Sequence, residues 1–176
     1  MTQRIPSADD LRHRTAIADC KARYCYLIDD WELEALPSLF TEDVILDYGG
    51  IGTYTGHEGI REFASVIEET LDRTTHLLSN PVIDIGVDGS PDAISDDPSQ
   101  ATGRWYVFST INYADGSSGV RVGTYRDRYR RVDDRWLIAE SHLRFTHSVD
   151  YDPEGANEDE NAGRWPQLTA HSSSQS

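Results

Sequence analysis

Tyr24, Asp29 and Asp30 lie close together in one segment, and their side chains could take part in proton transfer. The segment, residues 21–31, otherwise carries mostly bulky apolar residues. A phenol or a carboxylate on the core-facing side of a helix is costly unless it finds a hydrogen-bonding partner. His76 is the candidate partner, because a carboxylate bound to one imidazole nitrogen fixes the tautomer and makes the other nitrogen a better base. A contact between an aspartate and His76 would therefore indicate a catalytic pocket.

The same residues also allow a purely structural interpretation. Tyr24 and Tyr26 would then pack on an amphipathic helix, and the two aspartates would simply end it. Five helical steps of roughly 100° place Tyr24 and Asp29 about 140° apart, so on a regular helix they would flank a pocket rather than stack. His76 would be a surface residue or a satisfied core residue at the start of a strand.

Further candidate residues come from three predicted strands. In the last strand, His142 and Arg144 share a face with Trp136 by the two-residue period, and this face becomes polar toward its end. That pattern suits a strand that leaves the core for the mouth of a pocket, with Arg144 there, although a solvated strand end would look the same. His142 is a candidate for binding substrate. The other residues expected to line the cavity are Tyr48, Trp105, Val107 and Ser109.

Hydrophobic periodicity predicts the elements that would position these residues. Helical spacing runs over residues 8–31 and 57–71, with a short helical stretch over 32–40 that contains Pro37. Strand patterns, joined by turn-forming sequences, cover residues 44–48, 51–55, 74–87, 101–113, 120–132 and 136–147.

This order of elements predicts an α+β fold. We expect a curved, mostly antiparallel sheet wrapped around about three N-terminal helices, forming a cone whose open end is a pocket. Residues 1–149 would form a single domain. Residues 150–176 are acidic and then rich in serine, and we expect them to form a flexible tail.

The composition narrows the classes of partner. The chain of 176 residues has a net charge of -15 and a pI of about 4.6, which disfavours nucleic acid and anionic membranes as partners. No apolar run is long enough to span a membrane and the N-terminus has no signal core, so we expect a cytoplasmic protein. Cys20 and Cys25 would point to different sides of one helix, which disfavours a disulfide, and no Cys/His cluster has zinc spacing.

Several short patterns, taken in order, resemble SnoaL-like proteins of the nuclear transport factor 2 superfamily, whose fold is cystatin-like. The resemblance covers about residues 8–147. The patterns are Ala22-Arg-Tyr-Cys-Tyr-Leu-Ile-Asp-Asp, Leu39-Phe-Thr-Glu-Asp-Val, Thr75-His-Leu, Ala101-Thr-Gly-Arg-Trp-Tyr, Tyr125-Arg-Asp-Arg-Tyr and Asp133-Asp-Arg-Trp-Leu-Ile-Ala-Glu.

Within this superfamily the chain is most similar to scytalone dehydratase, bile-acid dehydratase and hexachlorocyclohexane dehydrochlorinase. The tyrosine, aspartate and histidine of the bile-acid enzyme match Tyr24, Asp29 and His76, and an arginine in its last strand matches Arg144. Tyr48 matches the second tyrosine of scytalone dehydratase. The first tyrosine of that enzyme falls near a different residue type here and is not carried over.

The resemblance implies a cofactor-independent lyase that carries out a dehydratase-type elimination on a small hydrophobic cyclic, polyketide-like or steroid-like substrate. His76 would remove a proton from carbon, Asp29 would orient His76, Tyr24 would donate to the leaving oxygen, and Arg144 would hold developing negative charge. Neither a metal nor an organic cofactor is expected.

Fold does not settle function, and other functions stay open. The same superfamily contains non-catalytic small-molecule binders, small subunits of ring-hydroxylating dioxygenases and ketosteroid-type isomerases. The resemblance also implies a homo-oligomer, either a trimer or a dimer.

Overall fold

The computed structural model describes residues 6–86 and 98–151. In these two ranges the helices are α1 (Ala8–Asp29) and α2 (Gly56–Thr70), with short 3-10 helices η1 (Leu33–Leu39) and η2 (Gly49–Ile51). The strands are β1 (Phe40–Asp47), β2 (Thr53–Thr55), β3 (Leu71–Ile85), β4 (Gln100–Tyr113), β5 (Ser118–Val132) and β6 (Arg135–Tyr151). None of the helices in the described ranges is long and apolar enough to cross a membrane.

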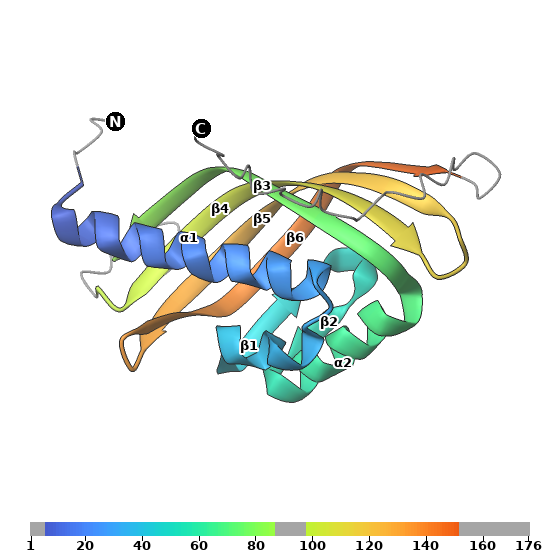
Figure 1. Cartoon of the computed structure of the whole chain (residues 1–176). Helices are drawn as coiled ribbons and strands as arrows, with labels where there is room; N and C mark the ends of the chain where they lie inside the picture. The colour runs from blue at the N-terminus through green and yellow to red at the C-terminus, as the bar shows by residue number, and fades with distance from the viewer. Residues whose placement is uncertain (1–5, 87–97, 152–176) are drawn as a thin grey trace, which may run out of the picture.

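The strands form one curved six-stranded sheet in the order β2-β1-β6-β5-β4-β3. Strand β1 pairs with β6 in parallel, and the other neighbours are antiparallel. Figure 1 shows α1 lying along the concave side of this sheet, with α2 near β1 and β2 at one end. The predicted α+β fold, a curved sheet wrapped around helices, is confirmed. The tail was predicted from residue 150, which is two residues too early, because Asp150 and Tyr151 belong to β6 and pair with Gly119 and Ser118 of β5. Residues 152–176 of the predicted tail lie outside the described residues.

Helix α1 carries the first part of the candidate site. Ser7 caps its start, since the Ser7 hydroxyl accepts from the Asp10 backbone N–H and the Asp10 carboxylate accepts from the Ser7 N–H. The helix ends at Asp29, two residues earlier than predicted, because Trp31 adopts a left-handed backbone with φ 59°. The last turn therefore fixes Asp29 at the C-terminal end of a rigid helix.

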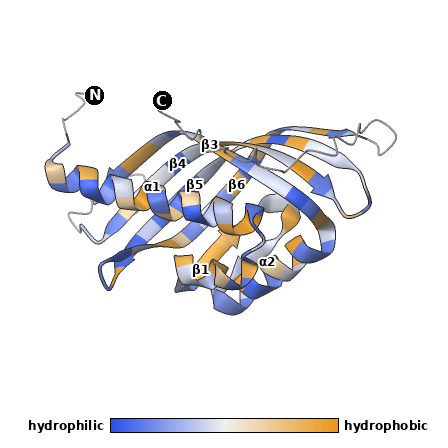
Figure 2. Cartoon of the chain, in the orientation of Figure 1, coloured by the Kyte–Doolittle hydropathy of each residue, from blue (hydrophilic) through white to orange (hydrophobic). Residues whose placement is uncertain are grey.

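Helix α2 closes one end of the cone with a single apolar face. Ile60, Phe63 and Ile67 are buried and recur at spacings of three and four residues, which is the period of an amphipathic helix. Figure 2 shows apolar positions alternating with hydrophilic ones along α2 and along the strands. The face of α2 that meets the sheet supplies one wall of the cavity described below.

Two irregularities in β6 decide which of its side chains face the helices. The pairing with β5 shifts between Arg128 and Tyr129, where β6 carries Ala139 as an extra residue, and again between Val122 and Gly123. An extra residue in one strand reverses the alternation of side chains beyond it. Trp136 and Ile138 face inward before the first shift, whereas Ser141, Leu143 and Phe145 do so after it.

Gly123 stands opposite the second irregularity, where two backbones approach closely. A Cβ atom at this position would lie 2.6 Å from the carbonyl oxygen of Arg144, a distance that no side chain tolerates. The glycine therefore permits the bend in β6 that brings its far end over the cavity.

Candidate active site

Asp29 and His76 form a two-point contact between α1 and β3. The His76 Nδ1 atom lies 2.7 Å from Asp29 Oδ1, and the His76 backbone N–H donates to Asp29 Oδ2 at 2.8 Å. Strand β3 is an edge strand, so backbone groups on its free side have no ladder partner, and Asp29 supplies one. Both side chains are 14% exposed. The contact predicted from the sequence is therefore present, and Asp30 takes no part in it.

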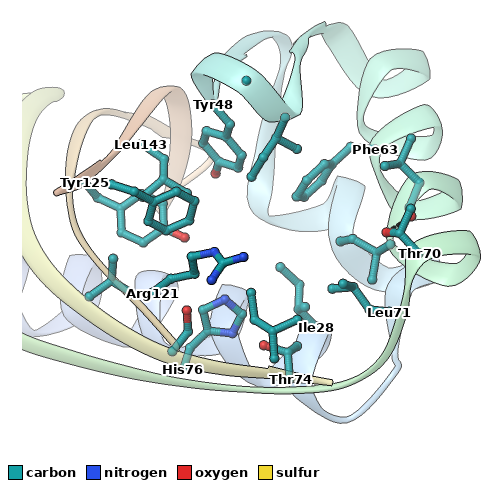
Figure 3. Close-up of a pocket in the computed structure, with 18 of the residues that line it drawn as sticks. Ile28, Tyr48, Phe63, Thr70, Leu71, Thr74, His76, Arg121, Tyr125 and Leu143 are labelled. Atoms are coloured by element: carbon teal, nitrogen blue, oxygen red, sulfur yellow. Dashed lines mark hydrogen bonds between the residues drawn. The ribbon is translucent and has the colours of Figure 1, made fainter. Parts of the chain in front are cut away.

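The contact determines which nitrogen of His76 is available for chemistry. A carboxylate only accepts hydrogen bonds, so the proton of the imidazole lies on Nδ1, facing Asp29. The Nε2 atom of neutral His76 then carries a lone pair and can act as a base. Figure 3 shows the His76 ring projecting into a cavity between the helices and the sheet.

This cavity has a volume of about 470 Å³, which fits a small organic molecule. Its lining is mainly apolar, and its polar groups include a row formed by His76, Ser109 and Arg121 on β3, β4 and β5. The residues that line it are Tyr24, Ile28, Tyr48, Gly50, Ile51, Phe63, Val66, Ile67, Thr70, Leu71, Thr74, His76, Val107, Ser109, Ile111, Tyr113, Arg121, Tyr125, Leu143 and Phe145.

Three tyrosines, Tyr24, Tyr48 and Tyr125, form a phenol cluster in the cavity wall. Tyr48 donates a hydrogen bond to the Tyr24 hydroxyl at 3.0 Å, and the rings of Tyr24 and Tyr48 each meet the Tyr125 ring edge-on. Burial raises the pKa of all three well above the ordinary value. Their hydroxyls therefore keep their protons at neutral pH, and the Tyr24 hydroxyl, which accepts from Tyr48, can use its own proton to donate to a bound oxygen.

Arg121 brings a positive charge to the same cavity. The register of β3, β4 and β5 places His76 opposite Ser109 and Ser109 opposite Arg121, so the three side chains share one row on the inner face. Arg121 is held by Asp150 at 2.5 Å and by the Tyr113 hydroxyl at 2.6 Å. Figure 3 shows its guanidinium projecting into the cavity together with His76. The row combines a base and a cation on adjacent strands.

The structure places most of the predicted site residues in this cavity. The predicted residues that line it are Tyr24, Tyr48, His76, Val107 and Ser109. Asp29 does not line the cavity but contacts His76 Nδ1.

Three predicted site residues lie elsewhere. Arg144 and His142 are exposed on the outer face of β6, where they pair with Thr124 and Arg126 of β5. The shift at Ala139 reverses the alternation on which the prediction relied, so their inner-face neighbours Leu143 and Phe145 line the cavity instead. Trp105 is buried below the cavity, and its indole N–H donates to the Tyr129 hydroxyl at 3.2 Å.

Arg121 and Tyr125 line the cavity but were not among the predicted site residues. The inward alternation of β5 was available as a signal, because Arg121, Tyr125 and Tyr129 fall at even spacing in one predicted strand. The sequence does not show which face of β5 points toward the helices, because that depends on how β5 pairs with β4. Within residues 6–86 and 98–151 no cluster of three or more His, Cys, Asp or Glu side chains could hold a metal ion.

Solved structures of similar shape include several enzymes and enzyme candidates. A scytalone dehydratase candidate from Novosphingobium aromaticivorans is 26% identical, with a TM-score of 0.70 over 85% of this chain and 97% of that one. An aromatic ring hydroxylase candidate from the same organism is 25% identical, with a TM-score of 0.69 over 84% and 96%. Hexachlorocyclohexane dehydrochlorinase type 3 from Novosphingobium barchaimii is 22% identical, with a TM-score of 0.69 over 81% and 92%.

Two further comparisons bear on the fold and the family. A protein from Nostoc punctiforme described as having a cystatin-like fold matches with a TM-score of 0.60 and 20% identity, over 79% of this chain and 92% of that one. The family model of the SnoaL-like domain matches residues 9–142, which include α1, α2 and the cavity-lining parts of β1 to β5. The chain belongs to the SnoaL-like domain family.

Proposed function

We propose that this protein is a cofactor-independent lyase that eliminates water, or a comparable leaving group, from a small hydrophobic cyclic substrate. The observation that carries the proposal is the 2.7 Å contact between Asp29 and His76 Nδ1, which leaves Nε2 to face an apolar cavity. The similarity in fold to a scytalone dehydratase candidate and to a dehydrochlorinase supports elimination chemistry.

The elimination needs one base, one donor and a means of holding charge. His76 Nε2 takes a proton from a carbon next to a carbonyl, the electron pair forms the new double bond, and the bond to the leaving oxygen breaks. Tyr24 donates its hydroxyl proton to that oxygen, so that water leaves. The proton on His76 then returns to the Tyr24 oxygen through solvent, which restores both groups.

Two further residues stabilise charge during this step. Asp29 stabilises the imidazolium that forms on His76 and keeps its ring in one orientation. Arg121, in the role first expected of Arg144, lies where it can favour the enolate oxygen that develops next to the attacked carbon. Both are charged groups fixed before the reaction, so little reorganisation is needed as charge develops.

The shape and lining of the cavity limit the substrate class. A volume of about 470 Å³ admits a fused-ring molecule, and the walls from Phe63, Ile67 and Leu143 are apolar. His76, Ser109 and Arg121 lie side by side in one row on the inner face of the sheet. We therefore propose a polyketide-like or steroid-like ring system that carries a carbonyl and a hydroxyl group near one edge.

A hydrogen-exchange experiment tests the base without requiring the true leaving group. The protein is incubated in D₂O with a panel of cyclic ketones, and deuterium uptake and loss of water are followed by mass spectrometry. We expect exchange, with or without elimination, that His76→Gln lowers by about 10²- to 10⁴-fold. His142→Gln, on the outer face, serves as the matched control. Equal exchange by wild type and His76→Gln would refute the proposal.

A non-catalytic role is the second candidate function. The 25% identity to an aromatic ring hydroxylase candidate favours a ring-hydroxylating dioxygenase small subunit over other binders. Such a subunit would purify with a larger iron-containing partner and would bind ring compounds without exchanging their protons. A ketosteroid-type isomerase would exchange protons but return a product of unchanged mass.

A further inference from the structure

A buried ion pair lies behind the phenol cluster, on the side away from the cavity. Lys21 Nζ lies 3.1 Å from Asp127 Oδ2, and both side chains are 0% exposed. Packed apolar residues would commonly stabilise a core at least as well as such a pair. Neither residue lines the cavity, so a direct role toward substrate is excluded by position. Asp127 is linked to the cavity by hydrogen bonds through the hydroxyl groups of Ser141 and Tyr48.

Asp127 fixes the hydroxyl proton of Ser141. Ser141, its neighbour across β5 and β6, donates to Asp127 Oδ1 at 2.7 Å, while Tyr129 donates to Oδ2 at 2.8 Å. A serine hydroxyl has one proton, and a carboxylate only accepts. Once Ser141 donates to Asp127, its oxygen can only accept from a further neighbour.

That neighbour is Tyr48, whose single proton has two possible acceptors. The Tyr48 hydroxyl lies 3.0 Å from the Tyr24 hydroxyl, to which it donates, and 3.3 Å from Ser141 Oγ. It cannot serve both fully. When Tyr48 donates to Tyr24, the Tyr24 oxygen is polarised and its own proton becomes a stronger donor. When Tyr48 turns to Ser141, that support is withdrawn.

We propose that Ser141, fixed by Asp127, is a positioning residue that competes for the Tyr48 proton and so sets how strongly the phenol cluster donates to an oxygen atom bound in the cavity. The Lys21 ammonium lies 3.1 Å from Asp127 Oδ2 and balances the charge of the carboxylate that accepts from Ser141. The ligand atom in question is the oxygen of a phenol or ketone. The proposal rests on the proposed function only in taking Tyr24 as the donor to that oxygen.

Ser141→Ala should bind an oxygen ligand more tightly than the wild-type protein does. Removing a buried hydroxyl ordinarily weakens a site, but here it leaves Tyr24 as the one acceptor for Tyr48. With 4-nitrophenol as the probe, we expect the dissociation constant of the phenolate to fall by about two- to tenfold, the range of one net hydrogen bond. The absorbance spectrum of the bound probe should also shift toward the phenolate form. Unchanged or weaker binding by a folded Ser141→Ala protein would overturn the proposal.

A double-mutant cycle separates this effect from general loosening of the core. In a Tyr48→Phe background the shared proton is absent, so adding Ser141→Ala should change the dissociation constant by less than about twofold. Tightening of the same size in both backgrounds would overturn the proposal. In a His76→Gln background the effect of Ser141→Ala should persist, since binding of the probe does not need a base. These binding measurements can therefore refute the role of Ser141 without refuting the lyase function, and the reverse also holds.

A measurement without ligand covers the case in which the probe binds too weakly or Ser141→Ala does not fold. Proton NMR of protein with ¹³C-labelled tyrosine reads the hydroxyl protons of Tyr24 and Tyr48 directly. Ser141→Cys, which is slightly larger and offers only a weak acceptor, should move the Tyr48 hydroxyl resonance downfield as its proton shifts fully to Tyr24. A Tyr48 hydroxyl resonance that stays in place in folded Ser141→Cys would overturn the proposal.

Discussion

At the scale of single residues, the site depends on how Asp29 holds His76. One carboxylate oxygen takes the ring proton and the other takes the backbone N–H of the same residue. The side chain and the main chain of His76 are therefore fixed by one group. This two-point contact makes Asp29 a positioning residue whose loss should change orientation and tautomer together.

Replacing Asp29 by Asn tests this role. The amide can keep one hydrogen bond, but its NH₂ group no longer requires a proton on His76 Nδ1, so Nε2 is more often protonated and unable to act as a base. We expect the rate of proton exchange to fall by about 10²- to 10⁴-fold, with little change in the melting temperature. A variant that retains the full rate would show that Asp29 only ends the helix.

The two buried thiols give a second prediction at this scale. Burial raises the pKa of Cys20 and of Cys25 from 9.0 to about 12, although Lys21 lowers both. The folded state holds these protons more tightly than the unfolded chain does. Their contribution to stability is therefore complete below about pH 9 and is lost as the pH rises toward 12.

Denaturation at several pH values measures this loss. We expect the urea midpoint to fall from about pH 9 upward, and the thiols of the folded protein to react slowly with Ellman's reagent at pH 8. In Cys20→Ala/Cys25→Ala the fall of the urea midpoint should begin nearer pH 10. The tyrosines that are buried in the folded state begin to ionise there in the unfolded chain. Fast thiol reaction in the native protein would contradict the buried placement.

At the scale of elements, the register of β6 decides which cation serves the site. The extra residue at Ala139 turns Arg144 outward, while the regular pairing of β4 and β5 turns Arg121 inward. These two arginines form a matched pair, one in the cavity and one on the opposite face of the sheet.

Alanine substitutions distinguish them. Arg121→Ala should lower turnover by about 10²-fold or more, since it removes the fixed charge proposed to stabilise the enolate. Arg144→Ala should leave turnover nearly unchanged and alter the free energy of unfolding by no more than about 0.5 kcal/mol. Loss of turnover in Arg144→Ala but not in Arg121→Ala would mean that β6 pairs with β5 without the extra residue at Ala139.

The contact between α1 and β5 gives a prediction on stability. Lys21→Met leaves the buried Asp127 carboxylate without its counter-charge, and we expect this to cost about 3–5 kcal/mol in the free energy of unfolding. Lys21→Met/Asp127→Asn removes both charges and should recover a large part of that loss. Chemical denaturation of the two variants gives both values. Equal losses in both variants would show that charge is not the cause.

The local elements followed from the sequence because each has its own pattern. The apolar spacing of Ile60, Phe63 and Ile67 and the paired turns between the long strands are local signals, and the structure confirms them. The contact between Asp29 and His76 was predicted because a core-facing carboxylate needs a partner, and the structure contains this contact. Arg144 was placed wrongly and Arg121 was missed, because an irregularity in strand pairing comes from contacts distant in sequence.

At the scale of the whole molecule, the outer face of the sheet carries an apolar patch. Leu77 is 60% exposed, Phe108 42% and Tyr106 53%, and the register places Leu77 directly opposite Phe108. Neighbouring exposed apolar side chains of this size commonly mark a contact with another chain. The strong negative charge of the molecule opposes loose self-association, so a specific interface is the expected use of this patch.

We expect a homo-oligomer that buries this patch. Phe108→Glu places a charge at its centre and should shift the particle mass toward that of a monomer in sedimentation velocity runs. Glu68→Ala, on the surface of α2, is the control and should leave the mass unchanged. A wild-type protein that sediments as a monomer at every concentration would rule out the oligomer.

The parallel pairing of β1 with β6 has a consequence for synthesis on the ribosome. Phe40 aligns with Ile138 and Leu46 with Ser141, so β1 finds its neighbour only after nearly the whole chain has emerged. Until then β1 and the α2 helix packed on it have no pairing with the long strands of the sheet. We expect a late, cooperative collapse in place of stepwise folding from the N-terminus, and a nascent chain that depends on chaperones until its last strand is released.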